Sequence, residues 1–255
     1  MSYGPDITQG IPRHSLMCCV VVDSHGRTTE PTQIPALPGS TDPVRIAQHY
    51  RSEGADVIFA DIWDTWGNLG RVLRLVEGLS ATGLSVIASI DNGALPSIEQ
   101  AQEVLDVGAF AIAVNTTAVD DPQLVTAAAR TLGGQHFVGV INVTTSPDGT
   151  WDVRVDGGRR PTGKHPAQWA AELSTLGIGS LVINDMDHET DGGGFNMPLL
   201  QAILRTTGVP VICGGGSRSP QDLPPALAAG AHGVLVLTQL HDGSHTVGEL
   251  LDALR

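Results

Sequence analysis

Eight short apolar runs, each followed by a longer segment with helical periodicity, constrain the fold of this 255-residue chain most strongly. The runs are rich in Val and Ile and do not alternate with polar residues, which is typical of strands buried on both faces of a parallel sheet. They cover residues 17–22, 57–60, 85–90, 111–114, 137–141, 181–183, 209–213 and 233–237. Eight successive strand–helix units predict an α/β fold of the (β/α)₈, or TIM barrel, type.

The helical segments and an internal repeat support this prediction. The helices are expected at residues 43–53, 69–80, 98–107, 122–132, 166–176, 198–206, 220–229 and 247–254, many of them opening near Pro and ending before Gly. Residues 54–64 match residues 177–187, and residues 82–87 match residues 207–212. An offset of about half the chain predicts two duplicated half-barrels. We therefore expect an N-terminal extension (1–15) and a single barrel domain (16–255).

The charge balance excludes some classes of partner. The chain has 14 Lys and Arg against 27 Asp and Glu, a net charge of −13. A nucleic-acid binder or a protein of anionic membrane surfaces usually has the opposite sign. No apolar run is long enough to span a bilayer, and the N-terminus does not resemble a signal peptide. Because the three cysteines are odd in number and two lie in an apolar run, we expect a reduced, cytoplasmic protein.

Polar residues follow every predicted strand, where the active site of such a barrel lies. An isolated Asp or Asn there is often only a helix cap or a turn residue. Eight polar strand ends at one mouth favour a functional site instead. The strongest local signal comes after the last two strands, where glycines let backbone N–H groups approach an anion. The predicted phosphate-binding residues are Gly214, Gly215, Gly216 and Thr238.

Residues 157–163 (Gly-Gly-Arg-Arg-Pro-Thr-Gly) resemble the active-site loop of the cyclase subunit of imidazole glycerol phosphate synthase, from histidine biosynthesis. Residues 54–62, 114–119 and 214–216 also resemble that family, and the similarity extends over roughly residues 16–255. The resemblance implies a barrel that takes ammonia from a glutaminase partner, closes an imidazole ring and releases an aminoimidazole carboxamide ribotide. It implies two aspartates, at the ends of strands 1 and 5, as acid and base, and two phosphate sites, one in each half.

This sequence differs from the family pattern at the acid–base positions. Asp23 occupies the strand 1 position, but Asn142 occupies the strand 5 position, and an amide cannot exchange a proton at a useful pKa. We expect Asp23 to be the main acid or base and Asn142 to orient the substrate. His25 or His188, or Glu189 and Asp185, remain alternatives for the missing carboxylate. The candidate catalytic residues are Asp23, Asn142, Asp187 and His25, and the candidate substrate-binding residues are Asp61, Asn115, Thr116, Asn184 and Gly163.

Two other regions also differ from the pattern. Asp91 lies in the first-half phosphate loop, where it would repel a phosphate, and Trp63 nearby is available to stack on a flat substrate end or to act as a lid contact. At the bottom of the barrel, neutral residues (Met17, Ala111 and Ser180) occupy positions that are charged in the family, which argues against a glutaminase-fed tunnel. We expect no cofactor and no metal, although Asp23, His25, Asp61 and His188 are the candidates for a divalent ion.

The sequence therefore predicts a cyclase- or lyase-like enzyme for a small phosphorylated, ribotide-like metabolite, with altered acid–base and phosphate sites, acting in a specialised pathway such as natural-product assembly. Three alternatives remain open at this point. They are a genuine histidine-biosynthesis cyclase, an Amadori-type sugar-phosphate isomerase on the same scaffold, and a non-catalytic ligand-binding barrel.

Overall fold

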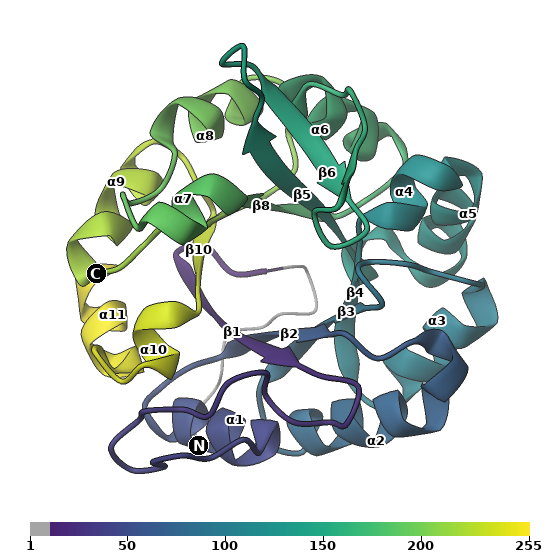
Figure 1. Ribbon diagram of the computed structural model, residues 1–255. Helices are drawn as coiled ribbons and strands as arrows, with labels where there is room; N and C mark the ends of the chain where they lie inside the picture. Colours follow the sequence, from purple (N-terminus) through teal and green to yellow (C-terminus); the bar gives the residue numbers. More distant parts are fainter. Residues whose placement is uncertain (1–10) are drawn as a thin grey trace.

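The computed structural model describes residues 11–255, which form a closed parallel barrel surrounded by helices (Figure 1). The barrel strands are β1 (Ser15–Val22), β2 (Val57–Ile62), β3 (Ser85–Ile90), β4 (Ala109–Val114), β5 (Phe137–Thr145), β8 (Ser180–Asp185), β9 (Val211–Gly214) and β10 (Gly233–Val236). Each strand pairs in parallel with the next, and β10 pairs with β1. The predicted (β/α)₈ barrel is confirmed. Residues 1–10 of the predicted N-terminal extension (1–15) lie outside the described residues, and β1 begins at Ser15.

The helices on the outside begin and end close to the predicted positions. They are α1 (Pro43–Ser52), α2 (Leu69–Ser80), α3 (Ile98–Asp106), α5 (Pro122–Leu132), α6 (Pro166–Thr175), α8 (Met197–Leu204), α9 (Leu223–Ala228) and α11 (Val247–Ala253). Capping fixes several starts: the Asp42 side chain accepts the N–H groups of Val44 and Arg45, and Asp121 accepts that of Leu124. Within residues 11–255, no helix is long and apolar enough to cross a membrane.

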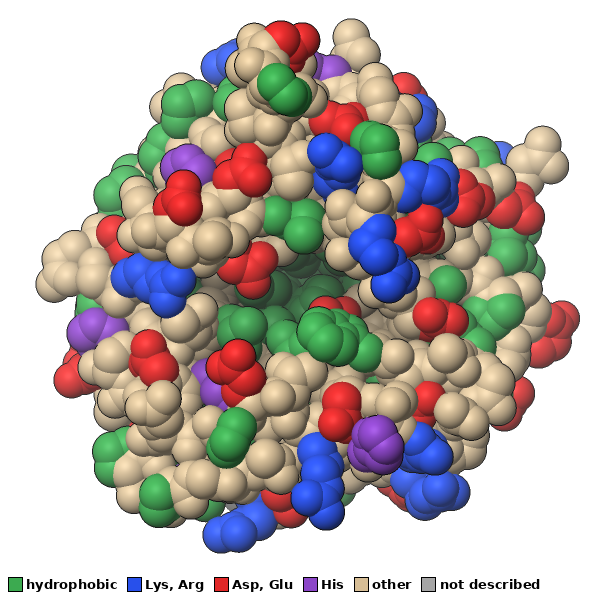
Figure 2. All heavy atoms as spheres, viewed as in Figure 1, with side chains coloured by type: hydrophobic (Ala, Val, Ile, Leu, Met, Phe, Trp, Pro, Cys, Tyr) green, Lys and Arg blue, Asp and Glu red, His purple; other side chains and the backbone are tan. Residues whose placement is uncertain are grey.

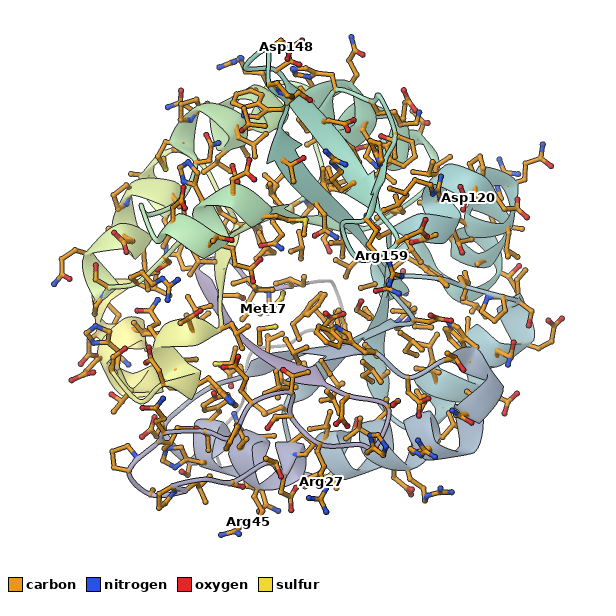
Figure 3. The ribbon with its side chains drawn as sticks, viewed as in Figure 1. Met17, Arg27, Arg45, Asp120, Asp148 and Arg159 are labelled. Atoms are coloured by element: carbon orange, nitrogen blue, oxygen red, sulfur yellow. The ribbon has the colours of Figure 1, made fainter. Side chains whose placement is uncertain are left out.

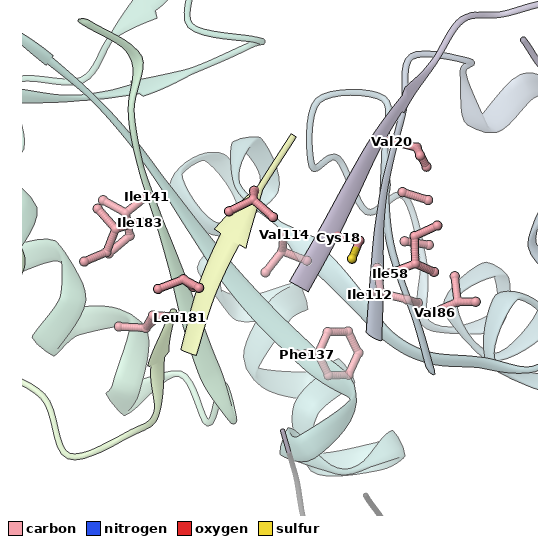
Figure 4. Packing of buried hydrophobic residues seen from close by; sticks show 14 of the residues in the cluster. Cys18, Val20, Ile58, Val86, Ile112, Val114, Phe137, Ile141, Leu181 and Ile183 are labelled. Carbon is pink, nitrogen blue, oxygen red and sulfur yellow. The ribbon is translucent and has the colours of Figure 1, made fainter. Parts of the chain in front are cut away.

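The strands are apolar on both faces because they separate two cores. Cys18 and Val20 of β1 pack outward, with Ile58 and Ile112, against the helices (Figure 4). Met17 points into the barrel, where it packs with Phe59, Ile87 and Val138 among others. Neighbouring residues of a strand point to opposite faces, so burial of both faces removes the polar alternation. Ile11 joins the interior cluster, and the Nε2 atom of His232 lies 2.9 Å from its carbonyl oxygen.

Matching glycines support the two half-barrels. Gly54 and Gly177 occupy equivalent places in the repeat and have φ angles of 105° and 89°. Gly108 and Gly230 form a second pair, with φ angles of 103° and 110°. All four follow a helix and precede a strand, where a left-handed residue ends the helix and glycine is favoured.

The sequence did not predict a hairpin and three short helices that lie at the mouth of the barrel. Residues 157–163, expected as a loop, form the turn and second strand of a hairpin made by β6 (Trp151–Val155) and β7 (Arg160–Pro161). The hairpin forms because β5 extends beyond the barrel and pairs antiparallel with β6. Three short helices also follow barrel strands: α4 (Thr116–Asp120), α7 (Met186–Asp191) and α10 (Thr238–His241).

Candidate active site

A cavity of about 530 Å³ opens at the carboxyl ends of the barrel strands. Figure 2 looks into this hollow, which has a hydrophobic floor and charged side chains around its rim. Its volume is that of a site for a small metabolite. The polar side chains that line it are Asp61, Ser89, Asn92, Asn115, Asn142, Arg159, Asn184, Glu189, Ser217, Arg218 and Thr238.

The structure brings together about half of the residues predicted for the site. Those that line the cavity are Asp61, Asn115, Asn142, Asn184, Gly215, Gly216 and Thr238. Those that do not are Asp23, His25, Thr116, Gly163, Asp187 and Gly214. Gly214 is the last residue of β9, directly before the cavity. The side chains at the ends of β2, β4, β5 and β8 therefore converge, whereas the loop after β1 does not reach the cavity.

Asp23 caps its own loop. Its Oδ1 accepts the N–H groups of His25 (2.8 Å) and Arg27 (3.0 Å). Desolvation acts to raise the pKa of Asp23, but these two N–H groups and the nearby His25 ring outweigh it, so the pKa is lowered. The His25 side chain is 80% exposed, with its Nδ1 3.6 Å from Asp23 Oδ2. In this conformation both side chains serve the turn after β1.

Three other predicted residues make structural hydrogen bonds at the mouth. The Thr116 hydroxyl donates to the carbonyl of Asn92 and accepts the N–H of Asp156, so it joins two loops. Asp187 accepts the N–H of Thr145 at 2.6 Å, which holds the end of β5. The N–H of Gly163 donates to the Asp152 side chain at 2.8 Å. These residues shape the rim without lining the cavity.

Carboxamide side chains dominate the polar wall. Asn184 Nδ2 lies 3.4 Å from Asn142 Oδ1 and 3.2 Å from Glu189 Oε2, so the strand 5 amide is linked to a carboxylate on α7. Asn115 Nδ2 donates to the carbonyls of Val140 (2.9 Å) and Arg154 (3.2 Å). Its Oδ1 is buried and finds no partner in the described part of the chain. A buried acceptor of this kind needs a donor, which a ligand can supply.

Asp61 and Glu189 are the carboxylates that line the cavity. Burial raises the pKa of Asp61, and the hydrogen bond from Trp63 Nε1 to Asp61 Oδ2 (3.0 Å) opposes the effect only in part. Burial also raises the pKa of the Cys19 thiol on the cavity floor, and the negative charges of Asp61 and then Glu189 raise it further. Both carboxylates therefore lie close enough to the cavity floor to raise the pKa of the same thiol, that of Cys19.

The raised pKa of Asp61 predicts a pH-dependent effect of Asp61→Asn on stability. A carboxyl whose folded pKa exceeds its unfolded value contributes stability below the unfolded pKa, and this is lost as the pH rises through the folded pKa. Asn cannot ionise, so the free energy of unfolding of the variant should rise relative to the wild type between about pH 4 and pH 7. Urea unfolding at both pH values measures this difference.

Asp148→Asn is the matched control. Asp148 lies in the turn between β5 and β6 (Figure 3), where hydrogen bonds from the Thr150 hydroxyl and N–H lower its pKa. A lowered pKa contributes stability above the unfolded value and loses it as the pH falls. The effect of the Asp148 variant should therefore have the opposite sign and lie below about pH 4, so this variant should change little relative to the wild type between about pH 4 and pH 7. A change of the same sign in both variants would contradict the assignment.

The loop after β9 forms a cradle of backbone N–H groups. Gly215 and Gly216 have φ angles of 83° and 99°. A Cβ atom would lie 2.4 Å from the Asp185 carbonyl oxygen at the first position and 2.3 Å from the Gly194 oxygen at the second. The N–H groups of Gly216 and Ser217 have no acceptor among residues 11–255. Thr238 begins α10, where the N–H has no acceptor in the helix. We call Gly215, Gly216, Ser217 and Thr238 the anion cradle.

The equivalent loop of the first half has a different character. Asp91, Asn92 and Gly93 all have positive φ angles, 50°, 58° and 72°. Burial raises the pKa of Asp91, as does the nearby charge of Asp64, whereas Arg159 lowers it. Arg159 extends from the hairpin turn to the edge of the opening (Figure 3). Arg159 and Asn92 thus line this side of the cavity, while Asp91 lies in the same loop outside the lining.

The metal hypothesis finds no support. In residues 11–255, no three His, Cys, Asp or Glu side chains lie close enough together to hold an ion. Asp23, His25, Asp61 and His188 therefore do not form a metal site in this structure.

Comparison with known proteins settles the family. The family model described as "Histidine biosynthesis protein" matches residues 24–246, most of the chain. The chain belongs to this family. The resemblance predicted from residues 157–163 and 214–216 is confirmed.

Similar family members include subunits of one enzyme. The imidazole glycerol phosphate synthase subunit HisF of Nocardia farcinica is 31% identical over 93% of this chain and 94% of its own length. The HisF subunit of Symbiobacterium thermophilum is 36% identical over 84% of both chains. That of Mycobacterium tuberculosis is 35% identical over 92% of this chain and 90% of its own. This histidine-biosynthesis barrel is therefore similar to cyclase-type subunits along nearly its whole length.

Several residues of this family member were not among the site residues predicted from sequence. Glu189 was only one of several alternative acids, because an acidic run after a strand does not reveal which member faces inward. Arg159 lies in the predicted Gly-Gly-Arg loop, but only the hairpin aims it at the cavity. Ser217 follows three glycines, a position that favours an anion contact.

Proposed function

We propose that this chain is a cyclase- or lyase-type enzyme that binds a small phosphorylated, ribotide-like substrate with the phosphate in the anion cradle. The free N–H groups of Gly216 and Ser217 beside the start of α10 are the observation that carries the proposal. Backbone N–H groups in a glycine loop are a recurrent phosphate site, and the loops after the last two barrel strands are its usual place. A specialised biosynthetic pathway is part of the proposal, because the catalytic wall differs from the pattern expected for the family.

The proposed chemistry uses the two carboxylates of the cavity. Ring closure or elimination needs a proton removed from one atom and a proton given to another. Asp61 and Glu189 line the cavity and supply such groups, whereas the Asn142 amide does not exchange protons at neutral pH. Asn115 and Asn142 are suited to orienting polar substrate groups through their amide oxygens. The Asp23 carboxylate is held by its own loop, which supports Asp61 over Asp23 as the reacting group.

Ribose 5-phosphate should protect the protein against unfolding. A ligand that binds the folded state at about 100 times its Kd stabilises that state by about 2.7 kcal/mol. For a chain of this size the melting temperature would rise by roughly 5–10 °C. Differential scanning calorimetry measures the shift, with ribose and with potassium chloride of equal ionic strength as controls. Equal protection by chloride, or no shift with ribose 5-phosphate, would exclude the phosphate site.

A genuine histidine-biosynthesis cyclase is the second candidate, because relatives named imidazole glycerol phosphate synthase subunit HisF match over most of the chain. Genetic complementation separates the two functions. Growth of a cyclase-deficient strain without histidine would support the second candidate. Absence of growth with normal levels of the folded protein would support the specialised enzyme.

The residues at the bottom of the barrel bear on whether a glutaminase can supply ammonia to the reaction. The resemblance implies a glutaminase, and the relatives are named as subunits of a synthase. Ile11 and Met17 pack with Ala111 inside the barrel of this chain, so its amino-terminal end is filled by apolar side chains. We therefore propose that any ammonia the reaction uses enters from solution at the mouth. Turnover with ammonium chloride that a glutaminase and glutamine do not increase would support this route.

A further inference from the structure

Trp63 lies at the mouth of the cavity. Among residues 11–255, Trp63 is the one exposed large hydrophobic side chain, with 53% of its surface accessible. It is one of the residues that line the cavity. Single exposed hydrophobic residues are common, so exposure alone assigns no role. Its surroundings give the second observation.

The Trp63 ring is held in place before any ligand arrives. Its indole N–H donates to Asp61 Oδ2 at 3.0 Å, and its backbone N–H donates to the Val22 carbonyl at 2.8 Å. Buried Asp64 fixes the following turn, because its Oδ1 accepts from the Thr65 N–H (2.9 Å) and from Asn68 Nδ2 (2.7 Å). The polar edge of the indole is thus satisfied. An ordered ring binds a flat partner with little further loss of conformational entropy.

The charges on this side of the cavity disfavour a second phosphate. Asp61 lies beneath the indole, and Asp91 lies in the neighbouring loop. Arg159, a cation at this part of the rim, already acts on Asp91. A phosphate dianion here would face the Asp61 carboxylate, with Asp91 in the adjacent loop and Arg159 as the cation that lines this side. At the other end of the cavity, the backbone N–H groups of the anion cradle lie beside Arg218, so the two ends suit different groups.

The wall between these ends carries amide acceptors. Among residues 11–255, the Asn115 side-chain oxygen is buried without a partner, and Asn142 accepts only the long contact of 3.4 Å from Asn184. Glu189 and Asp61 add carboxylate acceptors. A ligand that satisfies these oxygens brings N–H donors, such as the amino or amide groups of a nitrogen heterocycle.

We propose that the cavity binds a monophosphorylated ligand whose amino- or amide-bearing heteroaromatic ring stacks on Trp63 while its single phosphate lies in the anion cradle. This inference rests on the proposed function, since it assumes the phosphate site. It adds the substrate class, and it makes Trp63 the residue that favours a ring over a second phosphate.

Binding of two probes that differ by the ring tests the proposal. Isothermal titration of the full chain compares aminoimidazole carboxamide ribotide with ribose 5-phosphate. The ribotide should bind at least about tenfold more tightly, as expected for a base stacked on an aromatic side chain. Trp63→Ala should remove most of this preference and leave the Kd for ribose 5-phosphate within about twofold. Trp63→Phe should keep most of the preference, because a phenyl ring still stacks.

Trp151→Ala is the matched control, since Trp151 lies on the hairpin near His165 and not in the cavity. It should leave both affinities unchanged. Equal binding of the two probes by the wild type, or an unchanged preference in Trp63→Ala, would overturn the inference while leaving the phosphate site intact. Failure of both probes to bind would overturn the proposed function and the inference together.

Discussion

Glu189→Gln is expected to lower kcat for the ribotide substrate by about 10²- to 10⁴-fold, the usual contribution of a general acid or base. Glu189 lines the cavity, and its Oε2 lies 3.2 Å from Asn184 Nδ2. The glutamine amide keeps an acceptor for Asn184 but cannot transfer a proton. The loss should therefore appear in kcat while the affinity for the ribotide changes little. Steady-state kinetics together with titration of the ribotide separate the two quantities.

Asp23→Asn provides the comparison that decides which carboxylate reacts. Its Oδ1 accepts two backbone N–H groups, which an asparagine oxygen also accepts, so the turn should persist. If the reacting groups are those in the cavity, this variant should keep kcat within about threefold of the wild type, because general acid–base losses are far larger. The reverse result, with Asp23→Asn inactive and Glu189→Gln active, would restore the strand 1 assignment that the resemblance implies.

The barrel itself was predictable because its signals are local and repeated. Non-alternating apolar runs indicated the strands. The helical periodicity of residues 69–80 predicts α2, and Pro122 and Gly133 mark the two ends of α5. The sequence repeat that begins at Gly54 and Gly177 predicts the half-barrels, and the positive φ angles of both glycines agree with it. Each signal occupies fewer than about twenty residues, so it needs no tertiary contact to be recognised.

The site was less predictable because the direction of a side chain depends on contacts distant in sequence. Asp23 and Asp61 both follow strands, yet one accepts the N–H groups of its own turn and the other lines the cavity beneath Trp63. The Arg159 position depends on a hairpin that forms only because β5 extends past the barrel. An acidic run such as residues 185–189 contains three carboxylates, and the first turn of α7 selects which one faces inward.

Gly215→Ala should destabilise the fold strongly through the anion cradle. An alanine there must adopt a φ near +83°, which costs about 1–2 kcal/mol, and its Cβ would lie 2.4 Å from the Asp185 carbonyl oxygen. Overpacking against a fixed backbone adds about 1–3 kcal/mol. Asp185 cannot move cheaply, because its buried side chain accepts hydrogen bonds from Asp187, His188 and Asn196. A total of about 2–5 kcal/mol would lower the melting temperature by roughly 4–20 °C.

Gly149→Ala isolates the packing contribution, because Gly149 has the same φ of +83° but a Cβ added there would have no atom within 4 Å. This control should lose only the conformational part, about 1–2 kcal/mol, and keep full affinity for ribose 5-phosphate. Gly215→Ala should in addition weaken that affinity at least about tenfold, since the peptide that carries the Gly216 N–H would be displaced. Calorimetry measures the stabilities and titration the affinities. If both variants lost the same stability and both still bound the phosphate, the contact between the β9 loop and Asp185 would neither constrain the fold nor shape the cradle.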